Sequence, residues 1–141
     1  MLQLLFKLKG AAGLTLISDA VAAAGLGDGD YQIWGETINV KAGRTRNADG
    51  NIAGSVITML DAVRLMKSLG VSEVDLARMA STNPAQLLGI DHDCGSIEEG
   101  KRADLVALND QGQVVLTIIG GEIVFDTRIK VSDEFLSEPP A

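Results

Sequence analysis

The sequence predicts a mixed α/β fold that forms one portion of a larger structure, and three observations carry this prediction. A short, fully apolar run at Leu14–Ile17 is typical of a strand buried on both faces, as in parallel sheets. Residues 55–89 show helical patterning, and residues 104–125 show strands separated by turn signals. The chain has 141 residues, whereas a complete (β/α)₈ barrel needs roughly 250.

The first residues predict the end of a helix followed by this buried strand. Helical spacing relates Leu2, Leu5, Phe6 and Lys9, and Gly10 stands where a helix C-cap would. The strand at Leu14–Ile17 is then closed by Ser18 and Asp19. A single closed domain rarely begins with the end of a helix and an isolated buried strand, so we expect an upstream part.

Hairpins are predicted next, because glycine recurs throughout residues 25–54 between short β-rich pieces. The β-rich pieces are residues 31–34 and 37–40. Turns are expected at Trp34-Gly35-Glu36 and at Ala48-Asp49-Gly50.

Three helices should follow. Ser55 is the predicted N-cap of the first, which runs to about residue 69. Ser72 and Asp75 resemble a capping box for the second, through about Ala80. The third is predicted by a cap, a first-turn proline and a glutamine at the third helical position, and by a terminal glycine: Asn83, Pro84, Gln86 and Gly89.

After these helices the chain predicts an antiparallel meander. Residues 104–108 and 113–119 are apolar and β-branched, and Gly120-Gly121 is a two-residue hairpin signal that leads into residues 122–125. The polar remainder, residues 129–141, is expected to be a loosely held tail.

Composition excludes some partners. The net charge of −7 argues against nucleic acid or an acidic membrane surface, because both need clustered Lys and Arg. No apolar run approaches the roughly 18 residues of a membrane span. The single cysteine, Cys94, has no internal disulfide partner, so a reducing cytoplasm is the expected location.

Asp19 is the strongest catalytic candidate from the residues alone. It follows a buried strand, where parallel α/β folds place catalytic groups, and a carboxylate there can pass a proton from an attacking water to a leaving group. An ordinary turn aspartate is the alternative.

Gly54-Ser55 at a helix start is a second candidate, since free N–H groups there bind phosphate or sugar oxygens. Every helix has such an end, so this signal is unspecific.

Two acidic clusters are interpreted as surface loops. Asp28 and Asp30 lack the full twelve-residue calcium loop and its terminal glutamate. The residues of the 91–94 cluster, which include His92 and Cys94, are adjacent in sequence, so their side chains do not easily converge on one ion. We therefore predict no metal site within this chain.

Four segments resemble a known family. NPAQLLG (83–89) and GSIEEGKRADLV (95–106) are similar to segments of amidohydrolases in general. ISDAVAAAGLGDG (17–29) and DGNIAGS (49–55) are similar to segments of the N-acetylglucosamine-6-phosphate deacetylases, and this second pair is the more specific. The resemblance runs from about Met1 to Asp126.

This resemblance implies a fold and an activity. The chain would be the C-terminal portion of an amidohydrolase (β/α)₈ barrel plus strands of a small flanking β-sandwich. Residues 1–90 would form the last βα part of the barrel with a hairpin insertion, and residues 91–128 the sandwich strands. The reaction would be hydrolysis of N-acetylglucosamine 6-phosphate to glucosamine 6-phosphate and acetate.

The resemblance also implies site residues. Asp19 would be the catalytic acid and base, and Ile52, Ala53 and Gly54 would contact the sugar phosphate. The family's metal-binding Glu and His residues have no counterpart in this chain. A divalent metal, zinc or similar, would therefore belong to the complete enzyme, and this chain alone is expected to bind none and to be inactive.

Two alternatives stay open. One is deacetylation of a related amino sugar phosphate. The other is a non-catalytic module that associates with itself, because an unpaired strand edge at Leu14–Ile17 would seek a partner. For the enzyme, the expected partners are a second copy in a homodimer or the missing upstream half.

Overall fold

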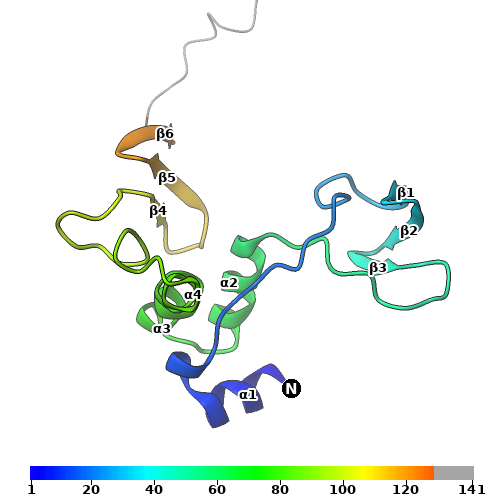
Figure 1. The fold of residues 1–141 in the computed structure, drawn as a ribbon, viewed down its shortest axis with the longest axis horizontal. Coiled ribbons are helices and arrows are strands. Elements are labelled where there is room, and N and C mark those ends of the chain that lie inside the picture. The colour runs from blue at the N-terminus through cyan, green and yellow to red at the C-terminus, as the bar shows by residue number, and fades with distance from the viewer. Residues whose placement is uncertain (129–141) are drawn as a thin grey trace, which may run out of the picture. The chain divides into compact units, whose positions relative to one another are not determined.

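The computed structural model of the chain describes residues 1–128 (Figure 1). The predicted polar tail at residues 129–141 lies outside the described residues. The chain divides into two compact units, Met1–Asp91 and a second that begins at His92. Within residues 1–128, no helix combines the length and the apolar character needed to cross a membrane.

The predicted N-terminal helix is confirmed as α1 (Leu2–Lys9). Gly10 ends it with a left-handed φ of 64°, and its N–H donates to the carbonyl of Phe6. A short 3₁₀ turn, Ala11–Gly13, follows. Glycine at position 10 suits this end because it takes a positive φ without a steric penalty.

The prediction of a buried strand at Leu14–Ile17 is wrong. Residues 14–19 are extended but belong to no sheet, and the N–H of Leu16 donates to the carbonyl of Met79 at 3.0 Å. Ile17 is 70% exposed, so the run is not buried on both faces. A strand needs a neighbouring strand for its ladder, and residues 1–128 place none beside this segment.

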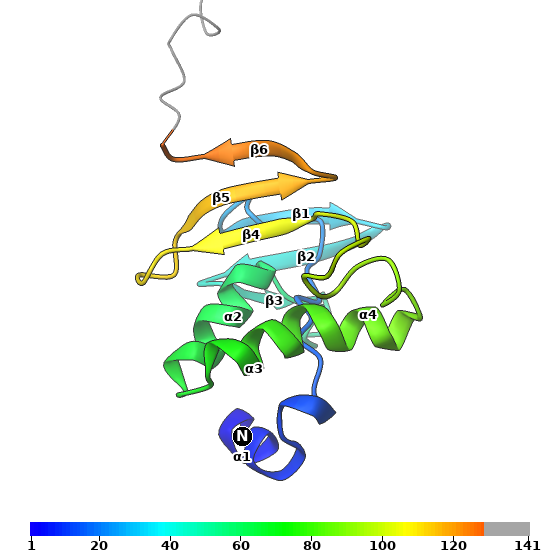
Figure 2. The ribbon, with the colours of Figure 1, turned by 90° about the vertical axis from the view of Figure 1, so that its left-hand side faces the viewer.

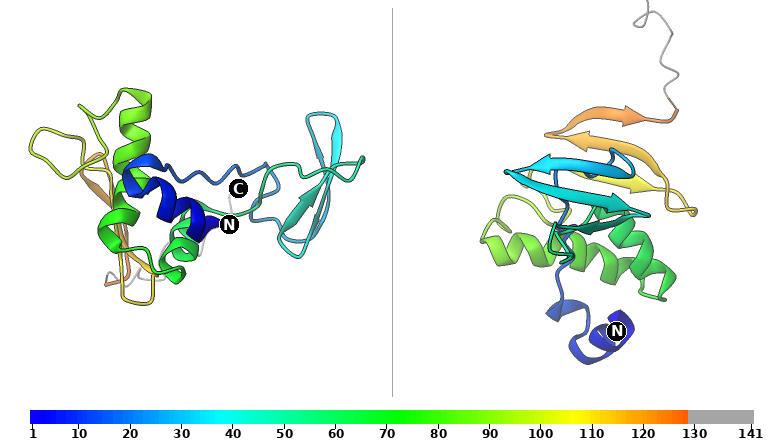
Figure 3. Two further views of the ribbon diagram at one scale, coloured as in Figure 1. Left: turned by 90° about the horizontal axis from the view of Figure 1, so that it is seen from below. Right: turned by 90° about the vertical axis from the view of Figure 1, so that its right-hand side faces the viewer.

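The predicted hairpins form a three-stranded antiparallel sheet of β1 (Gly29–Ile33), β2 (Glu36–Lys41) and β3 (Arg44–Arg46), coloured cyan in Figure 3. The turn at Trp34-Gly35 is confirmed between β1 and β2. The β2–β3 turn at Ala42-Gly43 was not predicted. Ile33, Ile38 and Val40 lie on the buried face of the sheet with Ala23, and this forms one apolar core.

The helix predicted to start at Ser55 begins later. Helix α2 (Met59–Ser68) has Thr58 as its N-cap, and Thr58 and Asp61 form a reciprocal capping box. These hydrogen bonds hold the pKa of Asp61 below its ordinary value, chiefly through the backbone N–H of Thr58. Ser55 is not a helix cap, because its backbone pairs with Ala20 in a parallel bridge. The prediction of a helix N-terminus at Gly54-Ser55 is therefore wrong.

Helix α3 (Glu73–Ala77) begins at Ser72 as predicted, with the Ser72 hydroxyl accepting from the N–H of Asp75. It continues through a π-helical turn, Arg78–Thr82, into α4 (Asn83–Leu88), which ends at Gly89 as predicted. The prediction of two separate helices, with Asn83 as the cap of the second, is wrong, because Asn83 has helical backbone angles. Its side-chain amide instead donates to the carbonyls of Ala11, at 2.7 Å, and Leu14.

A second apolar core gathers the helices of the first unit. Its buried members come from the 3₁₀ turn, α2, the α2–α3 connection, α3 and the π-helical turn, and partly buried side chains of α1 and of residues 14–16 pack against them. Buried members are Ala11, Met66, Val71, Leu76 and Met79.

Met79→Ala should lower the free energy of unfolding by about 2–5 kcal/mol, because the side chain is fully buried and its loss leaves a cavity. Urea unfolding followed by circular dichroism measures the effect. Met59→Ala is the matched control, since Met59 is 37% exposed. Equal losses in the two variants would contradict the central place of Met79 in this core.

The second unit contains the predicted meander. Strands β4 (Leu105–Leu108), β5 (Val114–Ile119) and β6 (Glu122–Asp126) form an antiparallel sheet in that order (Figure 2). Gly120-Gly121 joins β5 to β6, as predicted.

Candidate functional site

Asp19 closes the extended segment that leads away from the helices. Its φ of 50° is left-handed, a conformation that Asp tolerates better than most side chains. The residue is exposed, and within residues 1–128 its carboxylate has no hydrogen-bond or ion-pair partner. The carboxylate is thus available to a ligand or to water.

The segment that contains Ser55 runs beside Asp19. Ala20 and Ser55 form an isolated parallel bridge. The N–H of Ser55 donates to the carbonyl of Asp19 at 2.7 Å, and the N–H of Val21 donates to the carbonyl of Ser55 at 2.9 Å. The Ser55 hydroxyl donates to the carbonyl of Ser18. Two segments distant in sequence are therefore joined at Asp19.

Gly54 lies against the main chain of Asp19. A Cβ atom placed on Gly54 would lie 2.8 Å from the carbonyl oxygen of Asp19 and 3.8 Å from its Oδ2. It would also lie 2.8 Å from Cγ1 of Val21, and the φ of Gly54 is +73°. Only glycine fits this position without strain.

The structure brings Asp19 and Gly54 together, and the other two predicted residues precede Gly54 in the same segment. Ala53 is half-buried and packs against the core of the β1–β3 sheet. Ile52 is 75% exposed. Exposure of Ile52 leaves it open to a ligand, whereas Ala53 anchors the segment.

Sequence reasoning missed Thr45, which supports this segment from β3. Thr45 is buried, its hydroxyl donates to the carbonyl of Gly54 at 2.6 Å and it accepts from the N–H of Ala53 at 3.3 Å. A threonine between two arginines in a short strand was the available signal, since alternation places it on the inward face.

The described residues do not fit a metal centre. Residues 1–128 hold no group of three or more His, Cys, Asp or Glu side chains that could bind a metal ion. Asp19 therefore belongs to no such group in this part of the chain. No metal-dependent step can be built from these side chains.

The amidohydrolase-like segment at residues 95–106 forms the loop that leads into β4 and the first residues of β4 itself. The N–H of Gly120 and the guanidinium of Arg102 both donate to Asp104, and together they lower the pKa of that carboxyl, the Gly120 bond most. Arg102 also forms an ion pair with Asp93. These contacts tie the loop to the β5–β6 turn.

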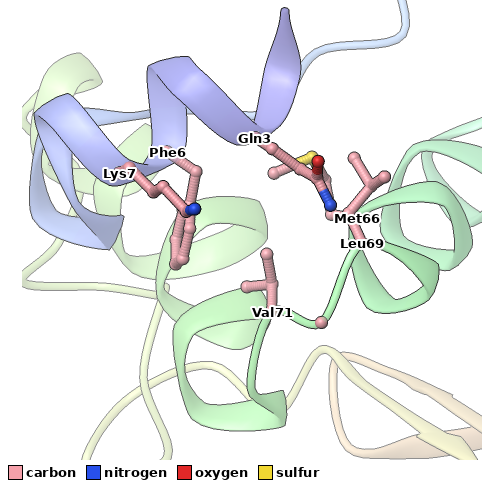
Figure 4. A pocket seen from close by; sticks show the side chains of 7 residues that line it. Gln3, Phe6, Lys7, Met66, Leu69 and Val71 are labelled. Carbon is pink, nitrogen blue, oxygen red and sulfur yellow. The ribbon is translucent and has the colours of Figure 1, made fainter.

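A cavity elsewhere in the first unit does not involve the predicted site. It has a volume of about 190 Å³ and lies between α1 and the end of α2. Figure 4 shows Phe6 of α1 and Val71 beside it, with Gln3 and Lys7 as its polar lining. A second cavity, of about 270 Å³, is lined by residues such as Asp28 and Val40, again without Asp19.

Comparison with known proteins adds a family. The model of the amidohydrolase family matches residues 45–124. An N-acetylglucosamine-6-phosphate deacetylase of Bacillus subtilis is 39% identical over 127 residues, which are 89% of this chain and 32% of that protein. A putative N-acetylgalactosamine-6-phosphate deacetylase of Escherichia coli K12 is 41% identical over 111 residues, which are 78% of this chain and 66% of that protein.

The fold is also similar to a solved structure. The crystal structure of N-acetylglucosamine-6-phosphate deacetylase from Thermotoga maritima matches with a TM-score of 0.85 and 41% identity. The match covers 90% of this chain and 35% of that one. The chain therefore spans about a third of the length of the Bacillus and Thermotoga proteins that it matches.

Proposed function

The chain belongs to the amidohydrolase family, and we propose that it supplies the proton-transfer residue and part of the substrate-contacting segment of an N-acetylglucosamine-6-phosphate deacetylase. The observation that carries this proposal is the close approach of Gly54 to Asp19. It brings an exposed carboxylate beside the segment that resembles the family's sugar-phosphate contacts. The similarity to deacetylases over nine-tenths of the chain supports it.

The chemistry assigned to Asp19 is proton transfer in amide hydrolysis. Its carboxylate accepts a proton from the water that attacks the acetyl carbon, and the new C–O bond forms. The protonated carboxyl then gives that proton to the nitrogen as the C–N bond breaks. Acetic acid and the free amine leave, the acid ionises to acetate by releasing its proton to the solvent, and Asp19 is again ionised.

The substrate contact is assigned to Ile52, Ala53 and Gly54. Gly54 has no Cβ, so its main chain packs directly against the carbonyl oxygen of Asp19 and the side chain of Val21. The Thr45 hydroxyl donates to the carbonyl of Gly54, and this hydrogen bond fixes the position of the segment beside Asp19. The metal that the family resemblance implies does not fit residues 1–128, so its ligands are assigned to the upstream part of the enzyme that the resemblance implies.

The finer architecture is proposed on the same grounds. Residues 1–90 form the last βα part of a (β/α)₈ barrel with a hairpin insertion, and residues 91–128 form strands of a small β-sandwich. Association with an upstream half supplies the metal ligands, and the complete enzyme is a homodimer. The similarity to the Thermotoga deacetylase supports this assignment.

A chimera tests the proposed function. The 127 matched residues of the Bacillus subtilis protein are replaced by the corresponding residues of this chain, and acetate release from N-acetylglucosamine 6-phosphate is measured with added zinc. We expect the chimera to retain deacetylation, because this chain contributes the proton-transfer residue. The isolated 141-residue chain is assayed in parallel and should release no acetate.

N-acetylgalactosamine 6-phosphate is the second substrate of this assay, because the Escherichia coli relative carries that name. The parent Bacillus protein is the positive control, and circular dichroism and zinc content establish that the chimera is folded and loaded. A folded, zinc-loaded chimera that hydrolyses neither substrate would contradict the proposal. A preference of the chimera for N-acetylgalactosamine 6-phosphate would change the proposed substrate to that sugar phosphate.

A further inference from the structure

Asp19 combines two properties that need an explanation. It is a non-glycine residue with a φ of 50°, and its side chain is exposed without a partner in the described part of the chain. A left-handed backbone at such a residue persists only where the surroundings fix it. Since the carboxylate makes no bond that could do so, the cause lies in the main chain on either side.

Ser55 supplies three hydrogen bonds that bracket Asp19. Its hydroxyl donates to the carbonyl of Ser18, the residue before Asp19. Its N–H donates to the carbonyl of Asp19 itself, and its carbonyl accepts from the N–H of Val21, two residues later. The peptide groups on both sides of Asp19 are thereby held by one residue.

We infer that Ser55 is a positioning residue for Asp19: its hydroxyl and its two main-chain groups fix the backbone from Ser18 to Val21 and so set the direction of the Asp19 carboxylate beside Gly54. The catalytic meaning of this positioning rests on the proposed function. Ser55 itself touches no reacting atom. We call these three hydrogen bonds of Ser55 the clamp. A substitution can remove the hydroxyl hydrogen bond while the two backbone hydrogen bonds can still form.

Ser55→Ala in the full chain tests the inference by hydrogen exchange and NMR coupling. The backbone amides of Val21 and of position 55 should exchange about tenfold faster, the change expected when one hydrogen bond of ordinary net strength is lost. The three-bond HN–Hα coupling of Asp19, which reports φ, should move away from the value in the unsubstituted chain. Ser55→Thr keeps a hydroxyl and should restore both observations.

Ser68→Ala is the matched control, because the Ser68 hydroxyl donates to the carbonyl of Leu65 in α2 and is remote from Asp19 in sequence. It should leave both readouts unchanged. Amides of β1 and β2 serve as an internal reference. Unchanged exchange and coupling in Ser55→Ala, acceleration spread equally over β1 and β2, or failure of Ser55→Thr to restore the coupling of Asp19 would each overturn the inference.

These readouts do not depend on turnover. An inactive chimera would remove the proposed function, while exchange and coupling in the chain would still decide whether Ser55 fixes Asp19. In an active chimera, Ser55→Ala should lower kcat with little change in KM, and Ser55→Thr should recover kcat. An unchanged kcat in Ser55→Ala would overturn the positioning role even if the exchange rates rise.

Discussion

Asp19→Asn in the chimera with the Bacillus subtilis protein should lower kcat for deacetylation by about 10²–10⁴-fold, the usual contribution of a general acid–base group. Asparagine has nearly the shape of aspartate but cannot accept the proton of the attacking water. It also tolerates the left-handed φ of 50° at this position, so the backbone clamp from Ser55 should persist. The loss should therefore report proton transfer and not a displaced loop.

Asp110→Asn is the matched control for this substitution, because Asp110 is exposed in the β4–β5 turn. It undergoes the same chemical change and should leave kcat unaltered. Zinc content is measured in both variants and should equal that of the unsubstituted chimera, since the family resemblance places the metal-binding Glu and His residues upstream of this chain. Near-normal turnover of Asp19→Asn with zinc bound would remove Asp19 from the mechanism.

The parts of the fold that the sequence predicted correctly are those with local causes. Gly10 ends α1, and Ser72 and Asp75 cap α3, because the required groups lie within one helical turn. The Gly120-Gly121 turn joins β5 to β6 for the same reason. Each of these elements is specified by residues a few positions apart.

The errors arose where distant residues decide the structure. Leu14–Ile17 is apolar enough for a buried strand, but no strand lies beside it in the described residues, so it stays extended and partly exposed. Ser55 has the residue type of a helix cap, yet its backbone is taken by Ala20. Asn83 likewise has a capping side chain, which instead reaches Ala11 and Leu14. Tertiary partners overrode the local signal at Ser55 and Asn83, whereas Leu14–Ile17 lacks a partner strand in the described residues.

The residues of the candidate site could be predicted from the sequence, but their arrangement in space could not. The family resemblance selected Asp19 and Gly54 separately, and no spacing in the sequence indicates that their backbones meet. The positive φ of Asp19, the hydrogen bond from the Thr45 hydroxyl to Gly54 and the hydrogen bonds of Ser55 all occur where the segment of Asp19 meets the segment of Ser55. No local pattern predicts a contact between segments so far apart in sequence.

The steric demand at this contact leads to the second large effect. Gly54→Ala should lower the free energy of unfolding of the chain by more than about 2 kcal/mol, since a left-handed φ alone costs a non-glycine residue roughly 1–2 kcal/mol. The φ of Gly54 is +73°, and the new Cβ would meet the Asp19 carbonyl oxygen at 2.8 Å. That oxygen belongs to the main chain and accepts from the N–H of Ser55, so it cannot move without loss of the bridge.

Gly43→Ala separates the cost of the left-handed φ from the cost of the steric contact when both variants are unfolded in urea. Gly43 has a φ of +71°, close to that of Gly54, but a Cβ there would have nothing within 4 Å. Its substitution should therefore cost only the backbone strain, and the additional loss in Gly54→Ala measures the contact with Asp19 and Val21. Equal losses of unfolding free energy in the two variants would mean that the Asp19 segment shifts away from the new Cβ at no cost. A segment that shifts so easily could not hold a proton-transferring carboxylate at a fixed distance from the substrate, so the same experiment tests the mechanism.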